Sequence, residues 1–418
     1  MTADPRTSTP PTPDGAADPR TYASHAPVGA DDGLTEAQRT VRAEFAAFAD
    51  EHLVPHADRW DRDEHLPREV VDQVAKAGHL GAAVPARYGG TGLDAVALGL
   101  LHGETGRACS SVRSLLTVHS MVAHALVRWG SADQRRHWLP RLADGTALGA
   151  FAVTEPDAGS DLGSVATSAR ADDRGGGYVL TGCKHWITFG QYADVFLVLA
   201  RLDAGGHAAF LVERDRPGLD VEPMTGALGT RASMLARVHL NGCRVPADHL
   251  VGRPGFGLSA VVATALELGR YSVAWGCAGL AEACLRACLA HADRRHQFGG
   301  RLRGHQLVQR MLADMATGAT AARLLCLRAG RLREAGDPAS VHATWMAKYF
   351  ASTAASRAAG DAVQIHGARG VGPDAPVQRY LRDARVMEII EGSTQLQQIV
   401  LADAAYQLFP PETERTNG

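Results

Sequence analysis

A carboxylate in an apolar setting stands near the end of the chain, and its neighbours suggest proton chemistry. Glu391 follows two isoleucines, Ile389 and Ile390, and precedes Gly392. An apolar environment raises the pKa of a glutamate towards the range in which it can take a proton near neutral pH. Glu391 is therefore a candidate general base, although a solvated glutamate before a helix break would produce the same local pattern.

Two segments in the middle of the chain carry residue types that suit a flat polar ligand. The first, 151–161, combines small residues with hydroxyls, so its backbone N–H groups and side chains could face such a ligand. It could equally be a simple turn. The second, 184–190, ends a strand with Trp186 and Thr188, where an indole could lie on a ring system and a hydroxyl could bond to it. A lone tryptophan is also a common core residue.

Two segments in the last third of the chain could bind phosphates. The arginines of 294–299 offer the fixed bidentate donors that a pyrophosphate favours, although adjacent arginines before a glycine also occur at solvated helix ends. The segment 364–370 is interrupted by glycines, so its backbone could approach a nucleotide. It is not a G-x-G-x-x-G motif after a strand, which excludes a Rossmann signal.

The elements that must position these residues change in type along the chain. Apolar residues recur at helical spacing from Leu34 to about 149, and again from Leu258 almost to Phe409. Between them lie short runs of strand length with turn residues between them. The sequence predicts helices over 68–77, 95–105, 112–129, 132–142, 258–294, 304–335, 338–366 and 375–408, and strands over 178–181, 195–200 and 208–212. The predicted organisation is a disordered tail (1–33), an N-terminal helical domain (34–149), a middle β domain (150–256) and a C-terminal helical bundle (257–410).

Composition narrows the class of protein. The 418 residues are 45% hydrophobic and 21% charged, as in ordinary soluble proteins, and the net charge of -2 gives no overall attraction to nucleic acid or anionic membranes. Seven scattered cysteines without a C-x-x-C pair argue against a disulfide framework and a zinc site. No uninterrupted apolar stretch is long enough to span a membrane, and the proline-rich start lacks a signal-peptide core. A cytoplasmic location is expected.

Taken together and in order, these motifs resemble the acyl-CoA dehydrogenase family over about residues 34–408. The resemblance implies a fold that is mostly α with a central β domain, in which an N-terminal helical domain and a middle β domain precede a C-terminal four-helix bundle. It also implies FAD-dependent α,β-dehydrogenation of an acyl thioester, with Glu391 as the catalytic base. A homo-oligomer, expected to be a tetramer, and an electron-transfer flavoprotein or other acceptor follow from the same resemblance.

The resemblance also assigns residues to the cofactor and the substrate. Part of the FAD site is expected from a neighbouring subunit. The chain departs from the residues usual in the family at four positions: it has Ser393-Thr394 in place of Thr-Ser, Ala368 in place of a glycine and Gln297 in place of a threonine. The expected substrate contacts are Ser160, Glu267, Arg270 and Gly392. The expected FAD contacts are Phe151, Val153, Thr154, Ser160, Trp186, Ile187, Thr188, Arg295, His296, Gln297, Phe298, His305, Gln306, Gln364, Ile365, His366, Gly367, Ala368, Ser393, Thr394 and Gln395.

Two alternative functions differ from this one in the carrier of the acyl group or in the class of ligand. The stretch 107–120 resembles the branch of the family in polyketide biosynthesis, where the acyl group is carried by an acyl carrier protein and becomes a malonyl-type extender unit. In that case the acyl group is expected to be short and polar. A flavin-bearing relative that binds nucleic acid would carry a basic C-terminal extension, whereas residues 410–418 contain no basic run.

Overall fold

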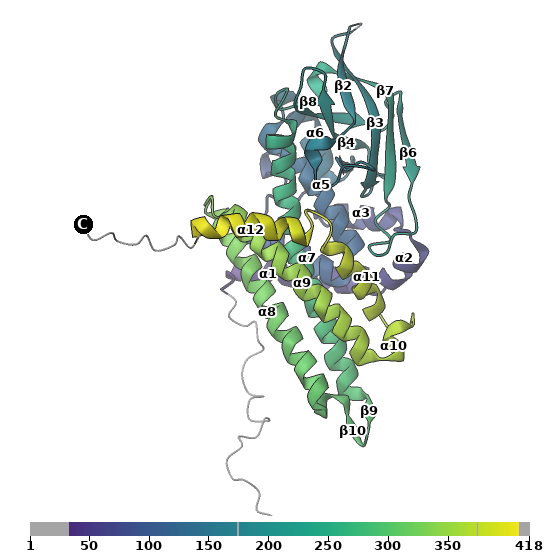
Figure 1. The fold of residues 1–418 in the computed structure, drawn as a ribbon, viewed down its shortest axis with the longest axis vertical. Coiled ribbons are helices and arrows are strands. Elements are labelled where there is room, and N and C mark those ends of the chain that lie inside the picture. The colour runs from purple at the N-terminus through teal and green to yellow at the C-terminus, as the bar shows by residue number, and fades with distance from the viewer. Residues whose placement is uncertain (1–32, 174, 374, 409–418) are drawn as a thin grey trace, which may run out of the picture.

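The computed structural model describes residues 33–408 except 174 and 374. Almost all of the predicted tail, 1–33, lies outside the described residues. Along the described chain, helices come first, a sheet follows, and long helices complete the molecule (Figure 1). The fold class predicted from the sequence is therefore confirmed.

The N-terminal helices begin at residues that satisfy free backbone N–H groups. Thr35 and Ser131 each form a capping box with a glutamine three residues later, and the Asp94 side chain accepts from the N–H of Ala97. These helices are α1 (Glu36–Phe48), α2 (Ala57–Asp63), α3 (Arg68–Lys76), α4 (Ala95–Ala108), α5 (Ser110–Trp129) and α6 (Ala132–Asp144).

The middle of the chain forms a mostly antiparallel sheet that contains eight strands within the described residues. Its order is β6-β7-β3-β2-β4-β5-β8, and β1 pairs in parallel with β4. Both faces of β4 and β5 carry apolar side chains. On one face they pack against α5 and α6, and on the other they pack against side chains of other strands. The strands are β1 (Gly149–Ala152), β2 (Ser168–Asp172), β3 (Gly177–Ile187), β4 (Val195–Leu202), β5 (His207–Glu213), β6 (Leu219–Pro223), β7 (Ala236–Pro246) and β8 (Leu250–Val251).

The C-terminal bundle is organised around one central helix, α7 (Ala263–Arg294), which packs against α4, α5, α8 and α9. The helical stretch Gly257–Arg294 is long and apolar enough to cross a membrane by composition, and its burial among these helices explains why. The remaining elements are the β9 (His296–Gln297) and β10 (Gly300–Arg301) hairpin, α8 (Gln306–Glu334), α9 (Ser340–His366), α10 (Ala368–Val371), α11 (Val377–Met387) and α12 (Thr394–Leu408).

The segment 375–408 is not one helix, as its periodicity predicted, but two. The break lies between α11 and α12, where Glu391 has φ 55° and Gly392 has φ 90°. Left-handed backbone is incompatible with a continuing right-handed helix, and it is costly for a residue with a Cβ. The candidate base therefore sits in a loop that the surrounding structure must hold.

Candidate active site

Three side-chain donors hold the loop that carries Glu391. Arg270 Nε donates to the Glu391 carbonyl at 3.2 Å. The Gly392 carbonyl accepts from Lys348 Nζ at 2.8 Å and from Gln397 Nε2 at 2.7 Å. Strained backbone of this kind persists only where neighbouring groups fix it, and it is concentrated at functional sites. The donors come from α7, α9 and α12, so the whole bundle fixes the position of the loop.

The Glu391 carboxyl group faces the beginning of α7. A Cβ built on Gly269 would lie 2.6 Å from Glu391 Cδ and 2.9 Å from the Met121 sulfur of α5. Only a glycine at 269 leaves room for this carboxyl group. Glu391 as a residue is half-buried, but its Oε2 is fully buried and has no hydrogen-bond partner among the described residues.

The environment of Glu391 raises its pKa to about 7, because burial penalises the charged form. The charges of Arg270, Lys348 and Arg113 act in the opposite direction and keep the ionised form accessible. The direction agrees with the sequence-based expectation, but the cause differs. Ile389 is 57% exposed and Ile390, next to the base in sequence, is only half-buried, so the contacts with Met121 of α5 and Gly269 of α7 contribute the burial that the sequence did not indicate.

The predicted flavin-ring segments lie together at one edge of the sheet. Trp186 ends β3 with φ 59° and is 54% exposed, and Thr188 follows half-buried. The N–H of His185 donates to the Thr154 carbonyl at 2.8 Å, which joins this strand end to the loop 153–160. Ser160 is exposed on the same loop. An exposed indole beside a hydroxyl and an open loop is an arrangement against which a flat ring system could lie.

A buried ion pair fixes this loop from below. Lys184 Nζ donates to Glu155 Oε1 at 2.7 Å and to the Val153 carbonyl at 3.1 Å. Glu155 also accepts from the N–H groups of Ala166 and Thr167, at 2.6 and 3.0 Å. Both side chains are at least 95% buried. Every oxygen that the pair brings into the interior is therefore hydrogen-bonded, as buried charges require.

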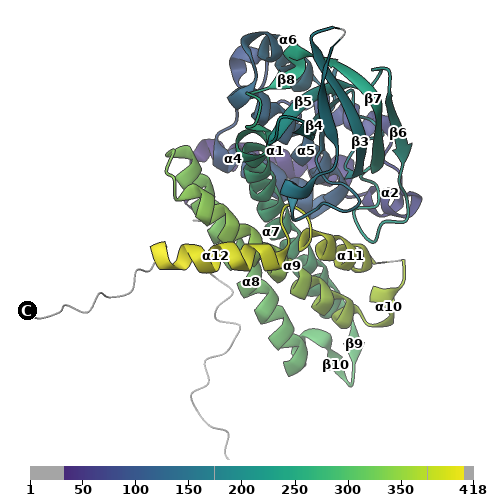
Figure 2. The ribbon, with the colours of Figure 1, turned by 45° about the horizontal axis from the view of Figure 1, so that its top comes forward.

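The predicted phosphate and adenosine contacts lie at the other end of α7. The β9–β10 hairpin projects from the end of the bundle that lies away from the sheet (Figure 2). Its residues 295–298 are exposed, and Phe298 is 97% exposed. The His366 ring stacks on His291 with centroids 4.3 Å apart, which places the 364–368 segment at the same end. One subunit thus divides the predicted FAD contacts into two groups.

The length of α7 separates these two groups. At about 1.5 Å per residue, Gly269 and Arg294 are roughly 38 Å apart along the helix. The contact of the base with Gly269 and the hairpin that follows Arg294 therefore lie at opposite ends of this helix.

The predicted substrate residues have different surroundings. Arg270 stacks on the Trp345 ring at 4.1 Å and bonds to the base loop. Glu267, which lies about one turn before Arg270 on α7, forms an ion pair with Arg333 of α8. Two buried cations near the base, Lys348 and Arg113, have no role predicted from the sequence. A signal for Lys348 existed, since it falls on the buried stripe of α9 with Thr344 and Ser352.

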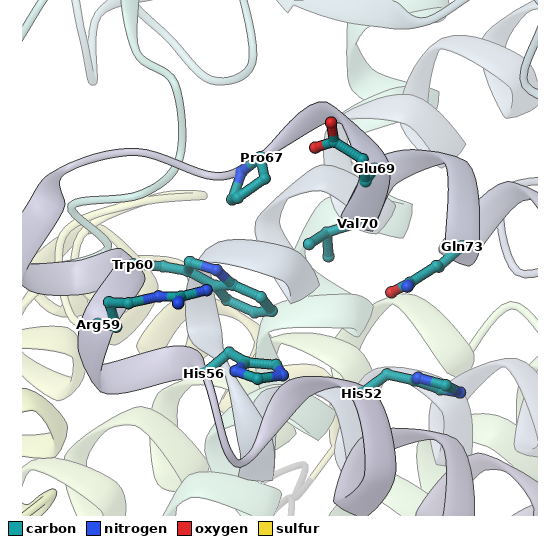
Figure 3. A pocket seen from close by; sticks show the side chains of 8 residues that line it. All are labelled: His52, His56, Arg59, Trp60, Pro67, Glu69, Val70 and Gln73. Carbon is teal, nitrogen blue, oxygen red and sulfur yellow. The ribbon is translucent and has the colours of Figure 1, made fainter.

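A shallow surface pocket lies elsewhere, between α2 and α3 (Figure 3). None of the predicted site residues lines it. The side chains around it are His52, His56, Arg59, Trp60, Pro67, Glu69, Val70 and Gln73.

Comparison with known proteins identifies the class. Residues 35–146, 150–243 and 255–406 match the N-terminal, middle and C-terminal domains of acyl-CoA dehydrogenase. The chain belongs to the acyl-CoA dehydrogenase family. It is an oxidoreductase that acts on the CH–CH group of acyl thioesters. The family is FAD-dependent, and a similar solved structure is described in complex with FADH2.

Individual relatives cover almost the whole chain. The mouse (Mus musculus) mitochondrial short-chain specific acyl-CoA dehydrogenase is 36% identical over 88% of this chain and 90% of its own length. A solved butyryl-CoA dehydrogenase from Megasphaera elsdenii is 31% identical with a TM-score of 0.86, covering 90% of this chain and 99% of that one. A solved protein for biosynthesis of the methoxymalonyl extender unit of a polyketide immunosuppressant is 36% identical with a TM-score of 0.80, covering 88% and 99%.

Proposed function

We propose that Glu391 removes the α proton of the acyl thioester. The observation that carries this assignment is a buried carboxyl oxygen without a partner, at a group whose pKa is about 7. Such a group can accept a proton near neutral pH, and three nearby cations stabilise the ionised form that acts as the base. We assign the backbone N–H of Glu391 and Gly392 to the thioester end of the substrate.

The other residues position the reactants. When bound, FAD supplies the acceptor for the β hydrogen, which leaves as hydride. Trp186 and Thr188, at the end of β3, and the loop 153–160 would hold its ring system. The base lies in the loop between α11 and α12, against Gly269 of α7. Removal of the α proton by Glu391 and of the β hydrogen by FAD requires the two groups to act on opposite faces of the substrate.

Replacement of Glu391 with glutamine tests the base directly. Glu391→Gln keeps the shape of the side chain and removes its basicity, so the protein should fold and retain FAD. A positioned base contributes about 10²–10⁴-fold, and loss of the only base should fall at the upper end of that range. Anaerobic bleaching of the flavin absorbance by substrate reports this step without any electron acceptor. Bleaching at the parental rate would rule out Glu391 as the base.

We further propose a homotetramer in which each FAD is shared by two subunits. Gly269, which contacts the base, and Arg294, which precedes the hairpin, lie roughly 38 Å apart along α7, a span that one FAD molecule does not bridge, and the hairpin exposes Arg295 and Phe298. A shared site predicts complementation between two inactive variants. Arg295→Glu damages the phosphate half, and Glu391→Gln damages the base half.

Mixed oligomers of these two variants should contain some intact sites, because each subunit contributes its undamaged half to a neighbour. Random pairing should restore about a quarter of all sites, and about half of the sites in mixed pairs, because one of the two sites in each mixed pair is intact. The variants should be co-expressed with different affinity tags and purified through both. Absence of restored bleaching in the doubly tagged oligomer would contradict the shared site.

A carrier protein is the second candidate for the acyl donor. It is supported by the likeness to a solved prolyl acyl carrier protein oxidase, which is 28% identical with a TM-score of 0.84 over 88% of this chain. A carrier-bound substrate would make turnover fall steeply with salt, because the recognition is electrostatic. Equal, salt-insensitive turnover of CoA and carrier thioesters would eliminate this candidate. We also propose a cytoplasmic location, which the free cysteines among the described residues support.

A further inference from the structure

Arg113 is a deeply buried cation whose nearest acceptors are all uncharged. It is 1% exposed. Its Nη1 donates to Thr117 Oγ1 at 3.0 Å, and its Nη2 donates to the thioether sulfur of Met387 at 3.0 Å. None of the ion pairs among the described residues includes Arg113. A buried charge without a counter-ion carries a large desolvation penalty, and natural proteins rarely retain one without a use.

The hydrogen bonds behind Arg113 continue through neutral groups. Thr117 Oγ1 lies 2.6 Å from Ser272 Oγ, which lies 3.0 Å from His102 Nδ1. Burial lowers the pKa of His102 to about 3, so its imidazole is neutral at physiological pH. This chain of hydrogen bonds fixes the guanidinium on one side but supplies no counter-charge.

The nearby acids cannot serve as a permanent counter-ion. Asp383 accepts from the N–H of Thr230 at 2.6 Å and lies 3.7 Å from the Arg379 guanidinium. The charge of Arg113 lowers the pKa of Glu391, but the two residues form no ion pair. Glu391 cannot be a permanent counter-ion in any case, because a base changes its protonation during turnover. The group that pairs with Arg113 must therefore come from outside the described residues.

The interface between α5 and α7 relates Arg113 to the base. Arg113, Thr117 and Met121 share one face of α5, and they meet Gly276, Ser272 and Gly269 of α7 in that order. A Cβ on Gly276 would lie 3.0 Å from Arg113 Cδ and Nε, as a Cβ on Gly269 would crowd Met121 and Glu391. The guanidinium reaches the level of Thr117. It thus lies one helical turn, about 5.4 Å, from the level of Met121 and the Glu391 carboxyl group.

We propose that Arg113 binds a carboxylate at the far end of a short acyl group, so that the substrate is the thioester of a dicarboxylic acid. This inference rests on the dehydrogenase function and on Glu391 as the base. With the α carbon at Glu391, the separation of about one turn must hold both the carbon chain and a charge-assisted hydrogen bond of about 2.8 Å, so that only a short dicarboxylyl group fits. The planar guanidinium can bind both carboxylate oxygens at once.

The test compares two CoA thioesters of equal length, one with a terminal carboxylate (glutaryl) and one with a terminal methyl group (pentanoyl). Their kcat/KM values are measured by anaerobic flavin bleaching at one pH. The parent protein should prefer the carboxylate. Arg113→Met should lower kcat/KM for that thioester by about 10²–10³-fold and change the methyl-terminated one far less. Arg113→Lys should fall in between.

Arg107→Met is the matched control, because Arg107 has ion pairs with Asp50 and Glu104 and lies outside this interface. It should leave the preference between the two thioesters unchanged. A melting temperature for ligand-free Arg113→Met at or above that of the parent supports the proposal, since the variant loses an uncompensated charge.

Two results would overturn the proposal: a parent protein that prefers the methyl-terminated thioester, or an Arg113→Met variant that keeps the preference. The first needs no variant, so it decides the matter even if Arg113→Met fails to fold. Failure of the underlying dehydrogenase function is distinguishable, because neither thioester would then bleach the flavin of the parent protein.

Discussion

Gly269 of α7 and Glu391 of the loop before α12 are in such close contact that the missing side chain of one makes room for the carboxyl group of the other. The two residues are far apart in sequence, and the contact brings the base against the helix interface that also holds Arg113. It follows that the residue type at 269 controls the position of the base.

Gly269→Ala should therefore slow the proton transfer. The added Cβ displaces the Glu391 carboxyl group, and a displacement of about 1 Å costs on the order of 10²-fold in rate. Anaerobic flavin bleaching measures the loss. Gly103→Ala on α4 is the control, because its Cβ would meet Trp275 at an ordinary 3.5 Å. Equal rates for both variants would show that the Glu391 carboxyl group does not need this space.

Lys348→Met should move the pH dependence of bleaching towards alkaline pH. The parent should lose activity as the pH falls through about 7, where Glu391 becomes protonated. Lys348 lowers the pKa of Glu391 by its charge, so its removal raises that pKa and shifts the acidic limb upward. A pH–rate profile of kcat/KM measures the shift. A slower variant with an unmoved limb would restrict Lys348 to its structural bond with the Gly392 carbonyl.

Glu155→Gln should destabilise the protein by about 3–5 kcal/mol, because it leaves the Lys184 ammonium buried without its counter-ion. FAD retention should fall together with the midpoint of urea unfolding, since the pair fixes the loop 153–160. Asp133→Asn is the control, because Asp133 and Arg136 form an exposed pair on α6 that contributes little. If the two variants unfold at the same urea concentration, the buried pair does not stabilise the fold.

The sequence predicted the order of helical, β and helical regions, because the change from helical to alternating periodicity is a local signal, but of the strands it predicted only parts of β3, β4 and β5. It predicted one helix over 375–408, however, because the break depends on left-handed backbone at Glu391, which no local pattern requires. The same limit applies to the base. Ile389 and Ile390 suggested the raised pKa, whereas Met121 and Gly269 produce the burial, and only tertiary structure brings them together.

Arg113 shows the remaining limit. An arginine on a predicted helix is normally read as a surface residue, and the glycine opposite it, Gly276, lies on a helix distant in sequence. By contrast, Lys348 interrupts an apolar stripe that was visible in the sequence. A cation within such a stripe deserves to be treated as a candidate site residue.

Because α7 is one unbroken helix of 32 residues, the direction in which side chains point at one end fixes the direction in which they point at the other. An insertion of one residue near its middle would turn everything beyond it by roughly 100° and advance it by about 1.5 Å. The beginning of the helix would still pack against the base, but the hairpin at its end would point in a different direction. Natural variation in chain length is therefore expected in the turns of the sheet and excluded from α7.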